Sequence, residues 1–204
     1  YKGQVIINGY IYSHNTSGKI YIRNIRHTVL GVTVHPVNVY INSSIEYVDC
    51  VIGQWIVNSR YPFVYGGDLV YKNCQFELAL STNNMARRFL IGSGAANYTF
   101  INCLFRHAGN LGLYDGSSLY MNQCTIVDEI GTSSFISVGL SESYFYNTAF
   151  WGVHPVTTIA TSTPPIVKNC FWHKAPYITG QGDDKQYFDS ANVAIKTNCI
   201  DHVI

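Results

Sequence analysis

Carboxylate and imidazole side chains recur at similar distances beyond one repeated phrase of this sequence. Counted from the sixth residue of three successive copies of the phrase, His107, Asp128, Glu129 and His154 lie four to six residues further along the chain. A pair of carboxylates near an imidazole can supply the general acid and base that cleave a glycosidic bond, or can abstract a ring proton of a uronate. We predict these four residues as the candidate catalytic group; the alternative is that they are solvated turn residues.

A second set of acidic residues lies at glycine-containing turns. Asp115 precedes Gly116, and Asp183 and Asp184 follow Gly182. These carboxylates are candidate ligand-binding groups, although acidic residues beside glycine are also common turn formers. The imidazole and acidic residues show no ligand spacing typical of a dedicated metal site. We therefore predict no metal and no other cofactor.

An internal repeat indicates which elements position these side chains. Its clearest copy is Leu69–Phe76, with the sequence LVYKNCQF, and successive copies lie about 25 residues apart. A repeat of this length is typical of a solenoid, in which equal offsets from the repeat become neighbours in space. The other copies are Ile20–His27, Ile45–Ile52, Tyr98–Phe105, Leu119–Ile126, Ser143–Phe150, Pro165–Trp172 and Ala194–Asp201.

Apolar residues alternate on both sides of a fixed polar position in the repeat. Leu69 and Tyr71 precede Asn73, and Cys74 and Phe76 follow it, so the alternation shifts by one residue at the asparagine. A strand cannot change face without breaking its pleat, and asparagine tolerates a left-handed backbone. We predict two short strands joined by a tight bend, with a buried ladder of asparagine amides. The bend column is Asn24, Asp49, Asn73, Asn102, Gln123, Asn147, Asn169 and Asn198.

A third strand is expected in each coil, after a connection of variable length. A β-sandwich with ordinary turn asparagines is the alternative fold, but a sandwich has no reason to repeat one phrase eight times. The predicted third strands are Gly31–His35, Trp55–Asn58, Arg88–Ile91, Leu111–Tyr114, Phe135–Val138, Thr158–Thr161 and Tyr177–Thr179.

The repeat resembles the right-handed parallel β-helix of pectate-lyase-like proteins, bacteriophage tailspikes and tail fibres. The resemblance covers roughly residues 20–200 and implies an all-β solenoid of about eight coils with three short strands each. Residues 1–19 are expected to form a strand and loop that lead into the β-helix domain of residues 20–204. Because Tyr1 is not an initiator methionine and no cap helix precedes the coils, we expect a fragment of a longer chain.

The resemblance leaves the chemistry open, because this architecture carries lyases, hydrolases and proteins that only bind. Gly182-Asp183-Asp184 is similar to one motif of polygalacturonase-type β-helices, but the other motifs of that family are absent. Pectate-lyase chemistry needs an acidic calcium site and an arginine base, and Arg87 and Arg88 have no acidic cluster in register. These departures put lyase activity in doubt.

The cysteines all occupy the inward column directly after the bend. Neighbouring coils would hold their side chains parallel at about 4.8 Å, whereas a disulfide needs Cβ atoms nearer about 3.8 Å. We predict free buried thiols, which favour folding in a reducing bacterial cytoplasm before assembly into a virion. Three Asn-x-Ser/Thr sequons keep a secreted origin open as the alternative. The column contains Cys50, Cys74, Cys103, Cys124, Cys170 and Cys199.

The composition argues against two classes of partner. Charged residues make up 12% of the chain and the net charge is +1, so the basic stripe that nucleic acid requires is missing. No apolar run approaches the roughly 18 residues of a membrane-spanning helix. We therefore predict neither nucleic-acid binding nor membrane insertion.

Aromatic residues divide into those at inward offsets and those outside them. The outer ones could stack on sugar rings, although inward positions of the third strands would claim some of them. The predicted core aromatics are Tyr71, Phe76, Phe100, Phe105, Phe145, Phe150 and Trp172. The predicted ligand-binding residues are Trp55, Tyr65, Tyr114, Trp151 and Tyr177, together with Asp115, Asp183 and Asp184.

Three functions fit these observations. The first is a domain of a bacteriophage tailspike or tail fibre that recognises a host surface polysaccharide; the resemblance implies that such a domain acts as a homotrimer. The second is a polysaccharide-degrading hydrolase or lyase on the same fold. The third is a solenoid spacer without a ligand, which would show no exposed aromatic wall.

Overall fold

The chain is almost entirely β-structure in the part that the computed structural model describes. That part comprises residues 5–8, 11–13, 18–30, 37–40, 43–56, 63–77, 91–92, 96–106, 111–112, 117–127, 136–137, 142–151, 166–173, 195–197 and 200–202. These residues form 23 strands, β1 to β23, and contain no helix. The strand pairings are parallel, which confirms the predicted all-β parallel solenoid.

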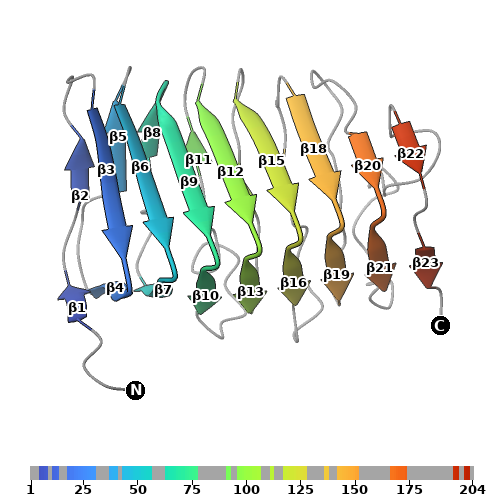
Figure 1. The fold of residues 1–204 in the computed structure, drawn as a ribbon, viewed down its shortest axis with the longest axis horizontal. Helices are drawn as coiled ribbons and strands as arrows, with labels where there is room; N and C mark the ends of the chain where they lie inside the picture. The colour runs from blue at the N-terminus through green and yellow to red at the C-terminus, as the bar shows by residue number, and fades with distance from the viewer. Residues whose placement is uncertain are drawn as a thin grey trace, which may run out of the picture.

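The strands form four sheets that run along the solenoid (Figure 1). Sheet A contains, in spatial order, β1 (Val5–Asn8), β4 (Ile25–Leu30), β7 (Val51–Ile56), β10 (Gln75–Glu77), β13 (Leu104–Arg106), β16 (Thr125–Val127), β19 (Ala149–Trp151), β21 (Phe171–His173) and β23 (Ile200–His202). Sheet C contains β3 (Gly18–Arg23), β6 (Ser43–Val48), β9 (Asp68–Lys72), β12 (Asn97–Ile101), β15 (Ser118–Asn122), β18 (Glu142–Tyr146), β20 (Ile166–Lys168) and β22 (Ile195–Thr197). Sheet B contains β2 (Ile11–Ser13), β5 (Val37–Tyr40), β8 (Phe63–Tyr65) and β11 (Ile91–Gly92), and sheet D pairs β14 (Leu111–Gly112) with β17 (Ile136–Ser137).

Each coil passes from sheet C through the bend into sheet A and then returns. In Figure 1 the strands of sheet C point downward in front, β5 and β8 lie behind them, and the chain advances from left to right. This path is a right-handed winding, the usual hand of parallel crossovers. About three turns are traced completely, against the eight coils that the repeat predicts, because most connecting loops lie outside the described residues.

The polar bend column has the predicted left-handed backbone. Its described members have φ between 50° and 56°, and their amides bond to one another from coil to coil. The Nδ2 of Asn73 donates to Asp49 Oδ1 at 2.9 Å, and that of Asn102 donates to Asn73 Oδ1 at 3.0 Å. The ladder side chains are exposed, so the expectation of a buried ladder was wrong: the bend turns them away from the core.

One coil departs from the regular ladder. Gln123 takes the bend conformation with φ 56°, but Asn147 donates to Oδ1 of Asn122 at 2.8 Å instead of to the glutamine. The ladder then continues from Asn169 to Asn147 at 3.1 Å. The left-handed bend is therefore kept where the ladder partner changes, which makes the bend the more regular feature.

The third strands differ from the prediction in the first coils. Trp55 belongs to β7 of sheet A, and the strand that returns the chain is β8, eight residues further on. The sheet A strands β4 and β7 have six residues each, against three in β10 and β13. The register between β4 and β7 shifts between Thr28 and Val29. The next three predictions fit better, since β14 and β17 lie within the predicted ranges and β11 begins at the last residue of its range. The predicted strands Gly31–His35, Thr158–Thr161 and Tyr177–Thr179 lie outside the described residues.

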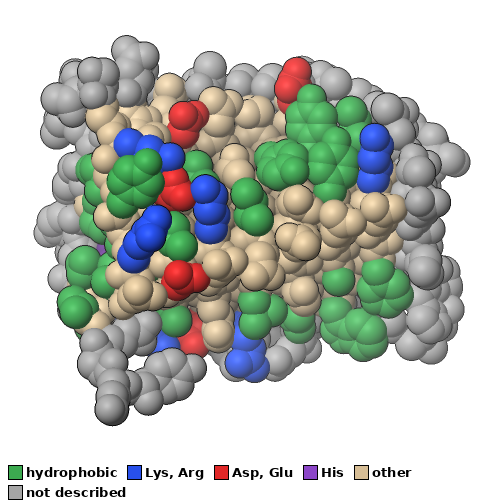
Figure 2. Space-filling model, viewed as in Figure 1, with side chains coloured by type: hydrophobic (Ala, Val, Ile, Leu, Met, Phe, Trp, Pro, Cys, Tyr) green, Lys and Arg blue, Asp and Glu red, His purple; other side chains and the backbone are tan. Residues whose placement is uncertain are grey.

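Side chains along the strands alternate between the interior and the surface. In β9 the pattern reads exposed, buried, half-buried, buried, half-buried, and β12 and β18 repeat it. The outer faces of sheets A and C carry the charged and aromatic groups visible in Figure 2. The interior is filled by two inward rows of sheet C, one inward row of sheet A and the cysteine column.

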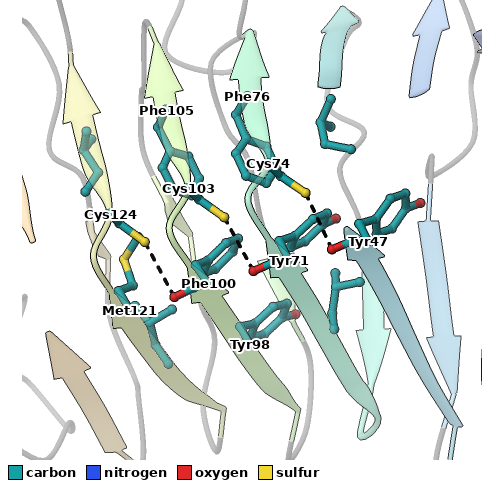
Figure 3. Close-up of a cluster of buried hydrophobic side chains, with 14 of the residues drawn as sticks. Tyr47, Tyr71, Cys74, Phe76, Tyr98, Phe100, Cys103, Phe105, Met121 and Cys124 are labelled. Carbon is teal, nitrogen blue, oxygen red and sulfur yellow. Dashed lines mark hydrogen bonds between the residues drawn. The ribbon is translucent and has the colours of Figure 1, made fainter. Parts of the chain in front are cut away.

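Aromatic rings stack along the axis inside the solenoid (Figure 3). Tyr47 stacks on Tyr71 at 4.9 Å between ring centroids, and Tyr71 stacks on Phe100 at 5.4 Å. In the facing row, Phe76 stacks on Phe105 at 4.4 Å. All the predicted core aromatics whose side chains are described are buried; the side chain of Trp172 is not among them. Parallel pairing spaces the rings at about one strand separation, which permits this stacking.

The cysteine column holds free, buried thiols at all five of its described positions, as predicted; Cys199 lies outside the described residues. Each thiol lies within hydrogen-bond distance of two strand carbonyls, one in its own coil and one in the preceding coil; Cys103 Sγ, for example, is 3.4 Å from Ile101 O and 3.5 Å from Tyr71 O. Thr148 occupies the same column and donates to Tyr146 O at 2.9 Å. Ile25 fills the same position after Asn24 with an aliphatic side chain, so a donor is common in this column but is not required. Burial raises the pKa of the Cys103 thiol, which keeps it protonated at neutral pH.

Candidate functional site

The predicted catalytic group cannot be placed. His107, Asp128, Glu129 and His154 all fall outside the described residues. The same holds for five predicted ligand-binding residues, namely Tyr114, Asp115, Tyr177, Asp183 and Asp184. These residues stay predictions.

The other three predicted ligand-binding residues lie in strands. Trp55 is near the end of β7 and Tyr65 ends β8, but their side chains are outside the described part. Trp151 ends β19 on the outer face of sheet A and is 51% exposed. Its ring stacks against Phe171 of the next coil, with centroids 6.4 Å apart and ring planes 24° from parallel. An exposed aromatic pair therefore exists at this predicted position.

Three tyrosines form a cluster on the outer face of sheet C. Tyr120 of β15 is in register with Tyr144 of β18, and Tyr146 lies two residues further along β18. The centroid of Tyr120 lies 6.5 Å from that of Tyr144 and 5.7 Å from that of Tyr146, and the last two are 6.2 Å apart. All three are half-buried against one another, so they present a continuous aromatic area to solvent.

Charged groups border the tyrosine cluster on two sides. The Tyr144 hydroxyl donates to Glu142 Oε2 at 3.1 Å, and this hydrogen bond raises the pKa of Tyr144. The ammonium of Lys168, in the next coil, lies 5.8 Å from the centroid of Tyr146. Both contacts restrict ring movement and leave the outer edges of the rings available.

The tyrosine cluster and the tryptophan pair lie on the same side of the molecule. Tyr146 and Trp151 flank one bend, at Asn147, and Figure 2 shows the two green groups above and below a band of backbone and polar atoms on the right. We call Tyr120, Tyr144, Tyr146, Trp151 and Phe171 together the aromatic surface. Exposed ladder amides lie between its two parts.

A second group lies at the other end of sheet C. Glu46 of β6 accepts from Lys19 of β3 at 2.6 Å and from Lys72 of β9 at 2.8 Å. The two lysines cover the carboxylate, whose residue is only 4% exposed although it points outward. The hydrogen bonds from the two lysines hold the pKa of Glu46 below its usual value, and the bond from Lys19 contributes most. Figure 2 shows these blue and red side chains on the left.

The aromatic surface and the group around Glu46 are suited to binding a ligand. Aromatic rings offer flat apolar area, and amides, hydroxyls and ammonium groups offer directional hydrogen bonds. Within the described residues, no group of three or more His, Cys, Asp or Glu side chains is arranged to hold a metal ion. Those same segments also contain no helix with the length and hydrophobicity needed to cross a membrane.

Sequence reasoning overlooked most of these residues because it followed the inward offsets. Tyr120 and Tyr144 stand four residues before the cysteine column, and Tyr146 stands two residues before it. These are the outward positions of the strand that precedes the bend, and Glu46 and Lys72 occupy equivalent ones. Aligning the copies at these two offsets would have found both groups, since equal offsets become neighbours in a stack.

No family model, curated protein or solved structure matches this chain. The parallel solenoid is established by its strand pairing alone.

Proposed function

We propose that this solenoid binds a polysaccharide of the bacterial surface through its aromatic surface. The observation that carries the proposal is the grouping of five partly exposed aromatic side chains on three consecutive coils, beside exposed asparagine amides. The solenoid is part of a bacteriophage tailspike or tail fibre in this proposal, and it acts there as a homotrimer. The resemblance of the repeat and the free buried thiols support that setting.

The chemistry of the aromatic surface suits a sugar chain. The C–H faces of a pyranose ring are apolar and pack on flat aromatic faces, while its hydroxyls require nearby donors and acceptors. The Tyr144 hydroxyl and the amides of Asn147 and Asn169 are placed to provide these. Neighbouring coils hold these groups about 4.8 Å apart, so one polymer chain can contact several coils at once.

A panel of purified capsular and O-antigen polysaccharides tests the proposal. Retention of the protein on each polymer reports binding, and the appearance of new reducing ends reports cleavage. For a polymer that is bound, Tyr144→Ala should weaken binding about tenfold, as expected for an aromatic anchor. Tyr144→Phe keeps the ring and is the matched control, so it should retain most of the affinity.

Two results would overturn the proposal. One is a folded protein that binds none of the polymers, which would favour the spacer. The other is binding that survives removal of both aromatic parts in a Tyr144→Ala, Trp151→Ala double variant. If new reducing ends appear, the protein also cleaves the polymer that it binds, and the predicted catalytic residues Asp128 and Glu129 are the first to test.

A further inference from the structure

We infer that the charged group at the opposite end of sheet C is a second subsite of the same glycan site, and that it binds an anionic substituent of the polymer. We call Lys19, Tyr21, Arg23, Glu46 and Lys72 the charged cluster. The inference rests on the proposed function and narrows it to polysaccharides that carry carboxylate or phosphate groups.

The five side chains of the charged cluster have an excess of positive charge among themselves, and two exposed carboxylates, Asp49 and Asp68, lie at its edges, where each accepts a hydrogen bond from an asparagine amide. One carboxylate, Glu46, is shared by Lys19 and Lys72, so these three side chains sum to +1. Arg23 adds a further charge; it is exposed and forms no ion pair with a described residue. It lies in the same outward row as Lys72, two strands or about 10 Å away.

The two ammonium groups are held in place and still accessible. Each bonds to Glu46 with one of its donors, and the two side chains are 41% and 40% exposed. Lys19 Nζ also lies 4.9 Å from the ring centroid of Tyr21, which is 58% exposed. Because an ammonium carries three donors, each lysine keeps donors for a ligand oxygen while its movement is already restricted.

Stability alone accounts poorly for this arrangement. A single lysine would neutralise the charge of Glu46, so the second lysine leaves one positive charge that the carboxylate does not balance. A second lysine and an arginine beside an exposed aromatic ring instead match the needs of an acidic sugar, which has one ring face and one anionic group.

The register of sheet C joins the charged cluster to the aromatic surface. Tyr21, Glu46, Tyr120 and Tyr144 belong to one outward row, which also contains Val70 and Thr99. Five strand spacings separate Tyr21 from Tyr144, or about 24 Å. A polysaccharide lying along this row, across the strands, would contact both groups at once.

Chemical neutralisation of a bound polymer provides the test. For polymers that the protein retains, carboxyl groups are reduced to alcohols, or phosphate groups are removed, and affinity is compared with that for the untreated polymer. We expect at least a tenfold loss after one of the two treatments, and which treatment causes it identifies the substituent. The affinity for the untreated polymer should also fall with salt.

Variants that remove one positive charge show which side chains bind the anionic group of the polymer. Arg23→Gln and Lys72→Gln should each weaken binding to the untreated polymer severalfold and leave binding to the neutralised polymer unchanged. Arg106→Gln, which removes the same charge from the exposed face of sheet A, is the control and should change neither. Thermal unfolding of each variant shows whether the fold is retained; Arg23→Gln keeps the lysines and Glu46 intact.

The outcomes separate this inference from the proposed function. Binding that is equal for native and neutralised polymers, or an Arg23→Gln effect no larger than that of Arg106→Gln, overturns the anionic subsite and leaves polysaccharide binding standing. Failure to bind any polymer overturns both.

Discussion

The inner and outer faces of sheet C belong to the same strands but follow different rules. The inner row that contains Tyr71 has largely apolar side chains in each coil from β3 to β20: Ile22, Tyr47, Tyr71, Phe100, Met121, Phe145 and Val167. The outer row changes along the axis: Tyr21, Glu46, Val70, Thr99, Tyr120, Tyr144 and Ile166. The repeated face specifies the coil, and the varied face is where one coil can differ from the next in what it binds.

The difference has a physical origin. An inward side chain must fill the space between the sheets and pack on its neighbours in the coils above and below. An outward side chain meets only its cross-strand neighbours and water, so many residue types are tolerated. Substitutions on the two faces should therefore have opposite consequences, with large losses of stability inside and losses of binding outside.

The largest effect on stability should come from the inner row. Phe100 is fully buried, stacks on Tyr71, and contacts Phe105 edge-on at 5.2 Å. Phe100→Ala should lower the free energy of unfolding by about 3–5 kcal/mol, measured by urea denaturation. Thr99→Ala, on the outer face of the same strand, should cost less than about 1 kcal/mol. Equal losses would refute the assignment of the two faces.

The bend separates the two strand segments, and its backbone should matter more than its ladder. Asn102 has φ 51° and donates one exposed ladder hydrogen bond. Asn102→Ala should cost about 1–2 kcal/mol, because alanine is strained in this conformation. Asn102→Gly loses the same bond without that strain and should cost less. A glycine variant as unstable as the alanine variant in thermal unfolding would assign the effect to the ladder.

The carboxylate of Glu46, in the outer row, should make the free energy of unfolding depend on pH in the acidic range. The pKa of Glu46 is lowered in the folded protein by its two lysines. A group of this kind stabilises the fold above its unfolded pKa, about 4.3, and this contribution disappears as the pH falls through the lower folded value. We expect Glu46→Gln to cost about 1 kcal/mol at pH 7 and to flatten the loss of stability below about pH 4.3. Parallel acid denaturation curves for the two proteins would contradict this.

The smallest effect on stability should accompany a clear effect on binding. Tyr120 is half-buried within the aromatic surface and contacts no core residue among its ring pairs. Tyr120→Ala should lower the free energy of unfolding by no more than about 0.5–1.5 kcal/mol, the value of lost ring contacts, and weaken retention on a bound polysaccharide severalfold. Comparing it with Tyr144→Ala shows whether adjacent coils contribute equally. If Tyr120→Ala leaves binding unchanged, Tyr120 does not contact the polysaccharide and β15 is not part of the site.

Much of the fold could be predicted because its signal is repeated. Most copies place an apolar residue at the positions of Leu69, Tyr71, Cys74 and Phe76, so a departure in one copy, such as Ser143 or Lys196, is outweighed by the other copies. The third strands were harder to predict, as Trp55 shows, because the connections before them vary in length and carry no fixed residue.

The candidate site could be predicted only in part. Trp151 was identified because it falls outside the inward offsets, and the structure shows it exposed. The tyrosine cluster and the charged cluster were overlooked because the alternation that revealed the core directs attention to the opposite face. The predicted group at His107 and Asp128 depends on loop positions that the repeat does not specify.

The sequence by itself determined the coil: its inward columns, its left-handed bend and the free thiols follow from residue types at fixed offsets. Only the tertiary structure decided which outer side chains meet, such as Lys19 and Lys72 on one carboxylate or Trp151 on Phe171. The physical reason is that packing constrains an inward side chain to one place. An outward side chain takes its position from neighbours that belong to other coils.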